Sequence, residues 1–390
     1  MWILLNSGSR WIQMLDLTVK TGCPDVHAKP EYRTRWGSWI RAGLILTVIS
    51  LATSSSGCSP IYVVKAGLAE LRILRARRDI AEILGDPSID TTTRGKLSFV
   101  LEARRFATNE LGINVGDSYT TFAQLDHDTL ALVVSAAHKD RLEAKTWWFP
   151  IVGRVPYKGF FSLDDARNEQ EKLEHEGFDT YLRPTAAFST LGWFSDPILS
   201  TVLRADDVEV VETVLHELSH QYLFVPGQVT FNESFATFVG RVGAAQFFCT
   251  RDGGGLNTSK CLRAQARWRD YQRFSVFVDS MMGELGAMYG DLNLTYDEKV
   301  SRREGIFTRA LKRFDDEVTP TFESVTFGGF RETSLNNATL LSRIRYYHRL
   351  PDFATMLEAR GGDLAELLAE LRTTVDTVPD PFDLLPGSTP

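Results

Sequence analysis

The stretch HELSHQYLFVPGQVTFNESFA, residues 216–236, constrains the fold of this chain more than any other part of the sequence. Positions four apart lie on one face of an α-helix, so His216 and His220 would project together, with Glu217 one step round the helix. Zinc binds neutral imidazoles, and a catalytic zinc site also needs a carboxylate that accepts a proton from water. The His-Glu-x-x-His pattern supplies these groups within five residues. It predicts a helix that carries two zinc ligands and a catalytic carboxylate.

A third zinc ligand is expected at Glu233, which stands 13 positions after His220. Its segment, residues 232–248, has helical spacing, and Pro226 and Gly227 mark a break before it. Two helices joined at this break would form a hairpin. In such a hairpin the first turn of the second helix can bring its carboxylate to the histidines.

Other interpretations of the same residues remain open. Thr230 and Glu233 fit a capping box, in which the glutamate would only close the N-terminus of its helix. Glu212, one turn before His216, is a reserve ligand, although a solvated helix face also accounts for it. A His-Glu-x-x-His pattern also arises by chance in some chains, and such a chain would hold only a helix, a turn and a helix.

Composition limits the classes of function. With 390 residues and 43% hydrophobic content, the chain can bury a large core in one domain or two. Its net charge of −7 offers no electrostatic attraction to nucleic acid, and we find no long basic stripe. We therefore expect no nucleic-acid partner.

The N-terminal region has the layout of a secretory signal peptide. Arg33, Arg35 and Arg41 precede an apolar run at residues 42–52, which is too short to span a bilayer as a helix. The following Ser-Ser-Gly-Cys sequence resembles a bacterial lipoprotein cleavage box that would make Cys58 a lipidated first residue. Plain cleavage or a retained anchor are the alternatives. We expect an exported chain of the bacterial cell envelope, anchored to a membrane through Cys58.

Three parts of the chain follow from this layout. We expect a leader at residues 1–57, a zinc metallopeptidase domain at 58–373, and a flexible C-terminal tail at 374–390 that is rich in Pro and Asp. Within the domain, Cys249 and Cys261 flank a loop, and export makes a disulfide between them as plausible as two idle thiols.

The periodicity of the remaining sequence predicts an α+β fold. It comprises N-terminal helices, a small mixed sheet, the metal helices and a mainly helical C-terminal part. Helices are predicted at residues 61–84, 91–113, 162–177, 208–224, 232–248, 261–285, 296–314, 335–350 and 362–372. Strands are predicted at 118–124, 129–137, 146–153, 155–161 and 178–185, with an edge strand or loop at 187–194.

Several segments together resemble a known family. GCSPIYVVKAG, RRFATNELGI, WWFPIVGRVPYKGFF, FSTLGWFSDPILST, HELSHQYLFV, FNESFATFVG and LNNATLLSRIRYY are similar to segments of the putative aminopeptidases of the bacterial envelope. The resemblance runs from about Gly57 to near Leu371. It implies a zincin-like, gluzincin-like fold and a peptide substrate. It also implies a Zn²⁺ ion bound by His216, His220 and Glu233, with Glu217 as the catalytic residue.

The sequence departs from that family in two places. Members tend to have cysteines in the segment that matches residues 147–161, whereas this chain has Trp148 and Arg154 there, which exclude a disulfide between those strands. The distance in sequence from His220 to Glu233 is also shorter than in thermolysin-like enzymes. That difference weakens any analogy with the substrate cleft of those enzymes.

Some roles are left without a certain residue. Tyr346, Tyr347 and His348 are candidates to stabilise the oxyanion, although core packing also explains a Tyr-rich helix. An aminopeptidase needs an acidic group for the free amine, and Asp196 is near the right segment, although a Ser-Asp-Pro turn explains it equally well. Trp193 and Phe194 are more typical of core positions than of substrate contacts.

Two further functions compete with a zinc peptidase. A non-catalytic envelope lipoprotein could use a structural metal or a capped helical hairpin, and a metal hydrolase could act on an amide other than a peptide.

Overall fold

The computed structural model describes residues 73–125, 131–149, 153–185 and 196–387. The expected leader, Cys58 and the segment at 187–194 lie outside these described residues.

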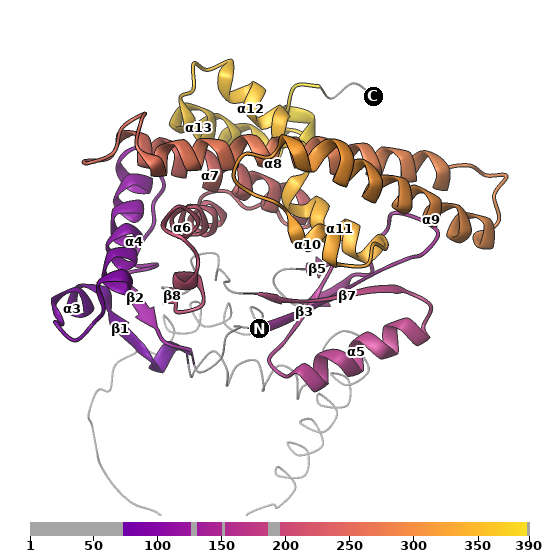
Figure 1. The fold of residues 1–390 in the computed structure, drawn as a ribbon, viewed down its shortest axis with the longest axis horizontal. Helices are drawn as coiled ribbons and strands as arrows, with labels where there is room; N and C mark the ends of the chain where they lie inside the picture. Colours follow the sequence, from indigo (N-terminus) through magenta and orange to yellow (C-terminus); the bar gives the residue numbers. More distant parts are fainter. Residues whose placement is uncertain (1–72, 126–130, 150–152, 186–195, 388–390) are drawn as a thin grey trace, which may run out of the picture.

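Helices account for most of the described chain (Figure 1). The α-helices are α3 Ile80–Gly85, α4 Thr91–Asn109, α5 Leu163–His175, α6 Asp207–Tyr222, α7 Val229–Thr250, α8 Ser259–Tyr289, α9 Tyr296–Arg313, α10 Gly328–Glu332, α11 Asn337–Tyr347, α12 Leu350–Glu358 and α13 Leu364–Thr374. The strands are β1 Arg77–Asp79, β2 Thr121–Ala123, β3 Ala131–Ala137, β4 Trp147–Phe149, β5 Gly153–Val155, β6 Lys158–Phe160, β7 Asp179–Thr185 and β8 Ile198–Leu199. The predicted α+β class is confirmed.

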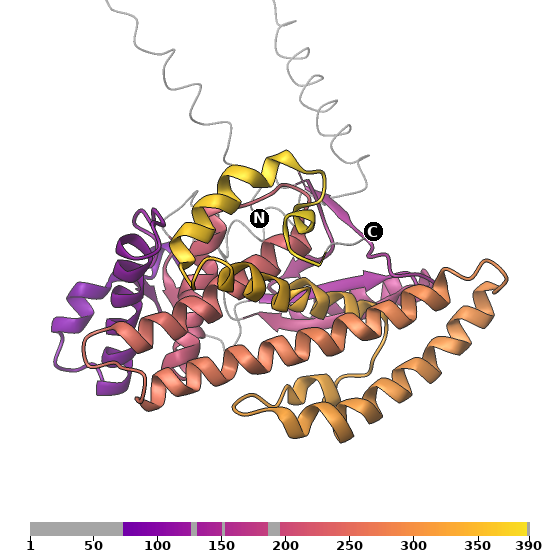
Figure 2. The same cartoon turned by 90° about the horizontal axis from the view of Figure 1, so that it is seen from above.

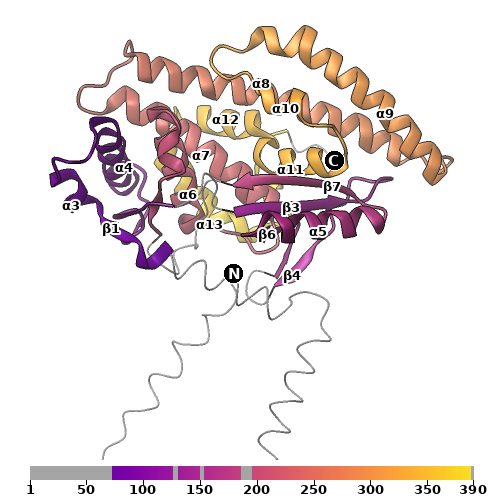
Figure 3. The same cartoon turned by 60° about the horizontal axis from the view of Figure 1, so that its bottom comes forward.

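An antiparallel sheet of order β6-β3-β7 lies between α5 on one face and α11 on the other (Figures 1 and 3). The sequence alternation of β3 explains the two faces, because successive side chains in a strand point to opposite sides. Val134 and Ala136 pack in the cluster that includes α5, whereas Ser135 between them accepts a hydrogen bond from Arg345 of α11. The sheet is therefore covered on both sides.

Two smaller sheets flank this one. In the first, β2 pairs antiparallel with β1 and parallel with β8. The second is the β4–β5 pair, in which Trp148 lies directly opposite Arg154. Neither residue is a cysteine, so no disulfide joins the two strands at this pair.

The helices stack around a long hairpin. Helix α6 packs against α4 and α7, and α7 packs in turn against α8 and α11. Figure 2 shows α8 and α9 running beside each other along one side of the molecule. The largest apolar core lies between α4, α6, α7, α12 and α13. The α6–α7 hairpin is thus held on several sides by buried side chains.

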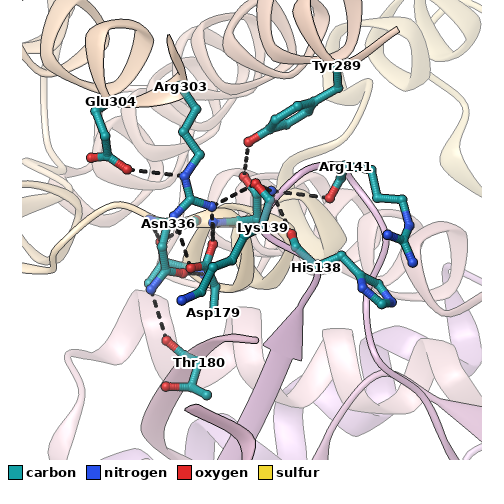
Figure 4. A network of polar contacts seen from close by, with 11 residues as sticks. His138, Lys139, Arg141, Asp179, Thr180, Tyr289, Arg303, Glu304 and Asn336 are labelled. Atoms are coloured by element: carbon teal, nitrogen blue, oxygen red, sulfur yellow. Dashed lines mark hydrogen bonds and ion pairs between the residues drawn. The ribbon is translucent and has the colours of Figure 1, made fainter. Parts of the chain in front are cut away.

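A buried polar network fixes α11 on the sheet (Figure 4). The guanidinium of Arg303 binds both carboxylate oxygens of Asp179, at 2.6 and 3.1 Å. Asp179 also accepts a hydrogen bond from the backbone N–H of Asn337, at the start of α11. Four residues further along β7, Arg183 reaches Tyr346 near the end of α11. Four strand residues and nine helical residues both span roughly 13 Å, so α11 lies along β7.

Two predictions of secondary structure and one prediction of flexibility are wrong. Residues 77–79 of the predicted helix 61–84 form strand β1, because they pair with β2. The predicted helix 335–350 ends at Tyr347, because Arg349 adopts a left-handed backbone conformation with φ of 55° and separates α11 from α12. The described part of the predicted flexible tail packs on the core, where Phe382 contacts Phe231 and accepts a hydrogen bond from Arg349.

Cys249 and Cys261 form a disulfide, which links the end of α7 to the start of α8. Of the two interpretations of these cysteines, the structure has the bond. Among the described residues, no helix has both the length and the apolar character that crossing a membrane requires.

Candidate metal centre

Helix α6 carries the first two predicted ligands. Asp206 caps its N-terminus by accepting hydrogen bonds from backbone N–H groups of the first turn. The apolar stripe of the helix is buried in the main core, and this burial sets the rotation of the helix. His216 and Glu217 are consequently partly exposed, and His220, one turn deeper, is buried.

Glu233 of α7 joins the two histidines in one cluster. Its Oε2 atom lies 3.3 Å from Nε2 of His216 and 3.6 Å from Nε2 of His220. One ligand atom from each of the three residues lies within 4.8 Å of the others. The structure thus brings together the three residues that the sequence selected as metal ligands.

The spacing of these atoms fits a zinc ion. Ligand atoms at tetrahedral positions about 2.0–2.2 Å from one zinc are roughly 3.4 Å apart. The two measured distances to the Glu233 oxygen bracket this value. Two imidazoles and one carboxylate are also a ligand set that leaves a fourth position free in catalytic zinc sites.

Glu233 does not cap its helix. Helix α7 begins at Val229, so Thr230 already lies inside it, and Gln228 occupies the capping position without a side-chain hydrogen bond. Glu233 therefore stands beyond the first turn, where its carboxylate faces the histidines. The capping-box interpretation is wrong.

The turn between the two helices is closed by a side chain. The amide of Asn232 accepts a hydrogen bond from the backbone N–H of Val225 at 2.9 Å and donates to its carbonyl oxygen at 2.8 Å. Gly227 within the turn has φ of 81°, a left-handed conformation that glycine adopts at little cost. Asn232 thereby fixes the position of the residue that follows it, Glu233.

Two more residues of α7 set the position of the helix. The Ser234 hydroxyl donates to the carbonyl oxygen of Arg345 and accepts from the backbone N–H of His348, which ties α7 to the end of α11. At Gly240, a Cβ atom would lie 2.6 Å from the carbonyl oxygen of Glu212 and 3.1 Å from Cβ of His216. A glycine here lets α7 approach α6 closely enough for Glu233 to reach both histidines.

Glu212, the reserve ligand, is not available to a metal. Its buried carboxylate binds the guanidinium of Arg267 through both oxygens and also pairs with Arg241. The sequence could not reveal this, because Arg267 comes from α8, 55 residues further along the chain.

Glu217 faces a different side of the cluster from α11. It lines a small cavity together with Tyr119, Ile198, Leu199 and residues of α6. Tyr119 is 3% exposed and has φ of 60°, and its hydroxyl makes no hydrogen bond with a described residue. Backbone strain of this kind in a residue other than glycine concentrates at functional sites.

Of the three oxyanion candidates, Tyr346 lies beside the cluster. Its ring stacks on the ring of His216, with centroids 6.2 Å apart and an interplanar angle of 25°. Its hydroxyl accepts a hydrogen bond from Nη2 of Arg183 at 3.2 Å. No described residue accepts the hydroxyl proton of Tyr346, so this proton can be donated to another group.

Tyr347 and His348 lie elsewhere. The ring of Tyr347 packs among Tyr271, Phe274 and Phe327, so the expectation that it is catalytic does not agree with its position. The Nδ1 atom of His348 lies 2.6 Å from a carboxylate oxygen of Asp279, and its ring packs on the C-terminal segment. Tyr346 and Tyr347, although adjacent in α11, thus contact different parts of the molecule.

The ionisable groups of the cluster shift one another's pKa values. Burial opposes ionisation of Glu233, but hydrogen bonds with both histidines hold its pKa below the usual value. Burial would lower the pKa of His220, and the hydrogen bond and charge of Glu233 raise it instead. Burial raises the pKa of Glu217, and the two histidines oppose that shift. A carboxylate with a raised pKa is suited to accept and return a proton.

A comparison with known protein families matches residues 61–379 to the family described as Putative aminopeptidase (Aminopep). The chain belongs to this family. The match covers more than half of the chain, in agreement with the resemblance seen in the sequence. Membership of the Aminopep family suggests a peptide hydrolase. Searches of curated proteins and of solved structures find no match to this chain.

Sequence reasoning did not select several residues that shape the centre of this Aminopep member. Arg183 and Tyr157 come from the sheet region, and no local pattern marks them as part of a site. The Asn-Glu-Ser triplet did carry a signal, because its polar residues stand at the start of an otherwise apolar helix. Each of the three has a separate task, namely Asn232 in the turn, Glu233 in the cluster and Ser234 on α11.

Proposed function

We propose that this chain is a zinc-dependent peptide hydrolase, an aminopeptidase of the bacterial cell envelope. The convergence of the imidazoles of His216 and His220 with the carboxylate of Glu233 carries the proposal, because these three groups are the ligand set of catalytic zinc sites that keep a free position, and Glu217 stands beside them. Membership of the Aminopep family supports the peptide substrate.

A bound zinc ion supplies Lewis acidity, which polarises the peptide carbonyl and lowers the pKa of the attacking water. His216, His220 and Glu233 would hold the ion. Glu217 would accept the proton of the attacking water on a carboxylate oxygen and return it to the nitrogen of the leaving amine. Tyr346 would donate its hydroxyl proton in a hydrogen bond to the developing oxyanion, and Arg183 would orient that hydroxyl.

The proposal includes the location of the chain. The apolar run after Arg41 and the Ser-Ser-Gly-Cys sequence support export, with Cys58 as a lipid anchor. The Cys249–Cys261 bond agrees with folding in an oxidising compartment.

Glu217 is the observation that weighs against a purely structural metal. A structural site closes its coordination sphere with protein ligands and has no use for a partly exposed carboxylate beside a free position. Its place next to the histidines, in a small cavity of its own, favours catalysis. A hydrolase of other amides would use the same groups, and substrate panels separate it from a peptidase.

The test combines metal content with turnover on the full-length chain. We expect about one zinc per chain in the wild type and in Glu217→Gln, and loss of zinc in Glu233→Ala. Hydrolysis should fall by a factor of about 10² or more in both variants. The substrate panel contains aminoacyl anilides, internally quenched peptides and non-peptide amides. A folded wild-type chain that binds no zinc and cleaves no member of the panel would refute the proposal.

A further inference from the structure

Three arginines are buried in the part of the chain that the structure describes, namely Arg267, Arg303 and Arg345. A buried guanidinium is normally compensated by a carboxylate, because removing its charge from water is costly. Arg267 has Glu212 and Arg303 has Asp179 as such a partner. Arg345 has none among the described residues, so its charge requires another explanation.

The contacts of Arg345 leave one end of its guanidinium unused. Nη2 donates to the carbonyl oxygen of Pro156 at 3.0 Å and to the hydroxyl of Ser135 at 3.4 Å. The guanidinium lies 5.3 Å from the ring centroid of Tyr157. Nη1 is buried and makes no hydrogen bond with a described residue. Burial also lowers the pKa of this arginine, in keeping with an uncompensated charge.

Arg183 is a second cation of the same cluster. Among the described residues, the one hydrogen bond of the Arg183 side chain goes to the neutral hydroxyl of Tyr346, and this side chain forms no ion pair with them. A guanidinium has five N–H donors, so most of those of Arg183 remain available. Arg183 also lines an open groove of about 800 Å³ along β7.

Both arginines lie next to the metal centre. Tyr346 connects Arg183 to it, because this residue contacts Arg183 through its hydroxyl and stacks on His216 through its ring, and Arg345 directly precedes Tyr346 in α11. The backbone carbonyl oxygen of Arg345 also accepts a hydrogen bond from the hydroxyl of Ser234, the residue that follows Glu233. Glu217 lines the cavity by Tyr119 and β8, so it and the arginines flank the centre from different elements.

We propose that Arg183 and Arg345 form an anion subsite that binds a carboxylate of the peptide substrate beside the cleaved bond. Guanidinium groups match carboxylates in shape and charge, and such pairs are among the strongest polar contacts in proteins. Arg183 makes the direct contact, and Arg345, whose guanidinium lies over the ring of Tyr157, adds its charge.

The inference rests on the proposed function and narrows its substrate class. The carboxylate is either the C-terminus of a very short peptide, such as a dipeptide, or an acidic side chain next to the cleaved bond. In a dipeptide, release of the N-terminal residue leaves the free carboxylate one residue from the cleaved bond. A preference for such peptides is consistent with an aminopeptidase that has cations in this position.

Equilibrium binding tests the subsite without catalysis. The full-length Glu217→Gln chain is titrated by calorimetry with Ala-Ala, Ala-Ala amide, Ala-Asp amide and Ala-Asn amide. We expect a carboxylate ligand to bind about tenfold or more tightly than its uncharged match. Ala-Ala against its amide reports on the C-terminal carboxylate, and Ala-Asp amide against Ala-Asn amide reports on a side chain.

Substitution of Arg183 in the same background identifies the group responsible. Arg183→Gln should abolish the preference, and Arg183→Lys, which keeps the charge, should retain part of it. The matched control is Arg309→Gln, which removes an exposed arginine of α9 that pairs with Glu284. This control should retain the full preference. Equal binding of charged and uncharged ligands, or a preference that persists in Arg183→Gln, would overturn the subsite.

Kinetics on the chain with Glu217 intact separates this inference from the proposed function. Arg183→Gln should raise KM for the carboxylate peptides about tenfold more than KM for amidated peptides. A chain that binds zinc and cleaves charged and amidated peptides equally well would keep the peptidase function and lose the subsite. A chain without zinc or turnover would lose the peptidase function, while the calorimetric preference would still decide the subsite.

Discussion

At the scale of single residues, Tyr346 and Tyr347 show how one position along a helix changes the role of a side chain. Tyr346 stacks on His216, whereas Tyr347 packs in an aromatic cluster with Phe274 and its neighbours. We expect Tyr346→Phe to lower kcat by a factor of about ten to a thousand, because it removes a donor to the oxyanion. Tyr347→Phe is the matched control and should leave kcat within about twofold. Steady-state kinetics of both variants decides the assignment, and equal losses would contradict it.

Gly240 offers a second prediction at this scale. An alanine would place its Cβ atom 2.6 Å from the carbonyl oxygen of Glu212, so α7 must move away from α6. We expect Gly240→Ala to lower the free energy of unfolding by about 1–3 kcal/mol and to weaken zinc binding. Denaturant titration and metal analysis measure the two effects.

The control for this substitution is Gly283 of α8, where an added Cβ atom meets nothing within 4 Å. Gly283→Ala should be neutral or stabilising by up to about 1 kcal/mol, because alanine has the higher helix propensity. Destabilisation of both variants to the same extent would show that close approach at Gly240 is not what matters.

The sequence made part of the candidate site predictable and hid the rest. His216, Glu217 and His220 form a local pattern, whose geometry follows from the helix alone. Arg183 and Arg345 stand 162 positions apart and approach one centre only because α11 lies along β7. Such a pair leaves no trace in local periodicity.

At the scale of elements, the network of Asp179 and Arg303 fixes the position of α11 over β7. Arg303→Met should lower the free energy of unfolding by about 3–5 kcal/mol, because it leaves a buried carboxylate without its partner. Arg309→Met removes an exposed arginine that pairs with Glu284 and lies on α9, the helix that also carries Arg303. It should lower the free energy of unfolding by about 1 kcal/mol or less. Chemical denaturation compares the two variants, and similar losses would contradict the assigned role of the buried pair.

Element boundaries were predictable where local signals act and not where tertiary contacts override them. The capping residue Ser162 and the helical spacing after it indicate α5 directly. Residues 77–79 are exposed, and no local pattern distinguishes them from the helix on either side. They form a strand because β2 offers a partner, which the sequence of the segment does not contain.

At the scale of the whole molecule, the Cys249–Cys261 bond closes a loop with a sequence separation of 12. Closing a loop of this size stabilises the folded chain by about 3 kcal/mol, because the bond restricts the unfolded chain. We expect a reductant to lower the Tm of the wild-type chain, and the Cys249→Ser, Cys261→Ser double variant to have this lowered Tm whether or not reductant is present. Thermal unfolding of both chains measures this. A wild-type Tm that ignores complete reduction would contradict the expectation.

The metal centre should not depend on this bond. Cys249 and Glu233 stand 16 positions apart on α7, which is roughly 24 Å along the helix axis. Zinc content of the folded chain should therefore be the same with and without reductant.

The α+β class was predictable from the order of elements, but the packing of the C-terminal segment was not. Phe382 and Leu385 stand in a stretch rich in Pro and Asp without a helical or strand pattern, and both are buried in the main core.

The presence or absence of the same disulfide depends on the compartment in which the chain folds. In a reducing compartment Cys249 and Cys261 would remain thiols, and no covalent bond would restrict the connection between α7 and α8. Once oxidised, the connection stays closed until a reductant opens the bond. Two copies with the same sequence can thus differ in resistance to proteolysis solely through the compartment in which each was completed.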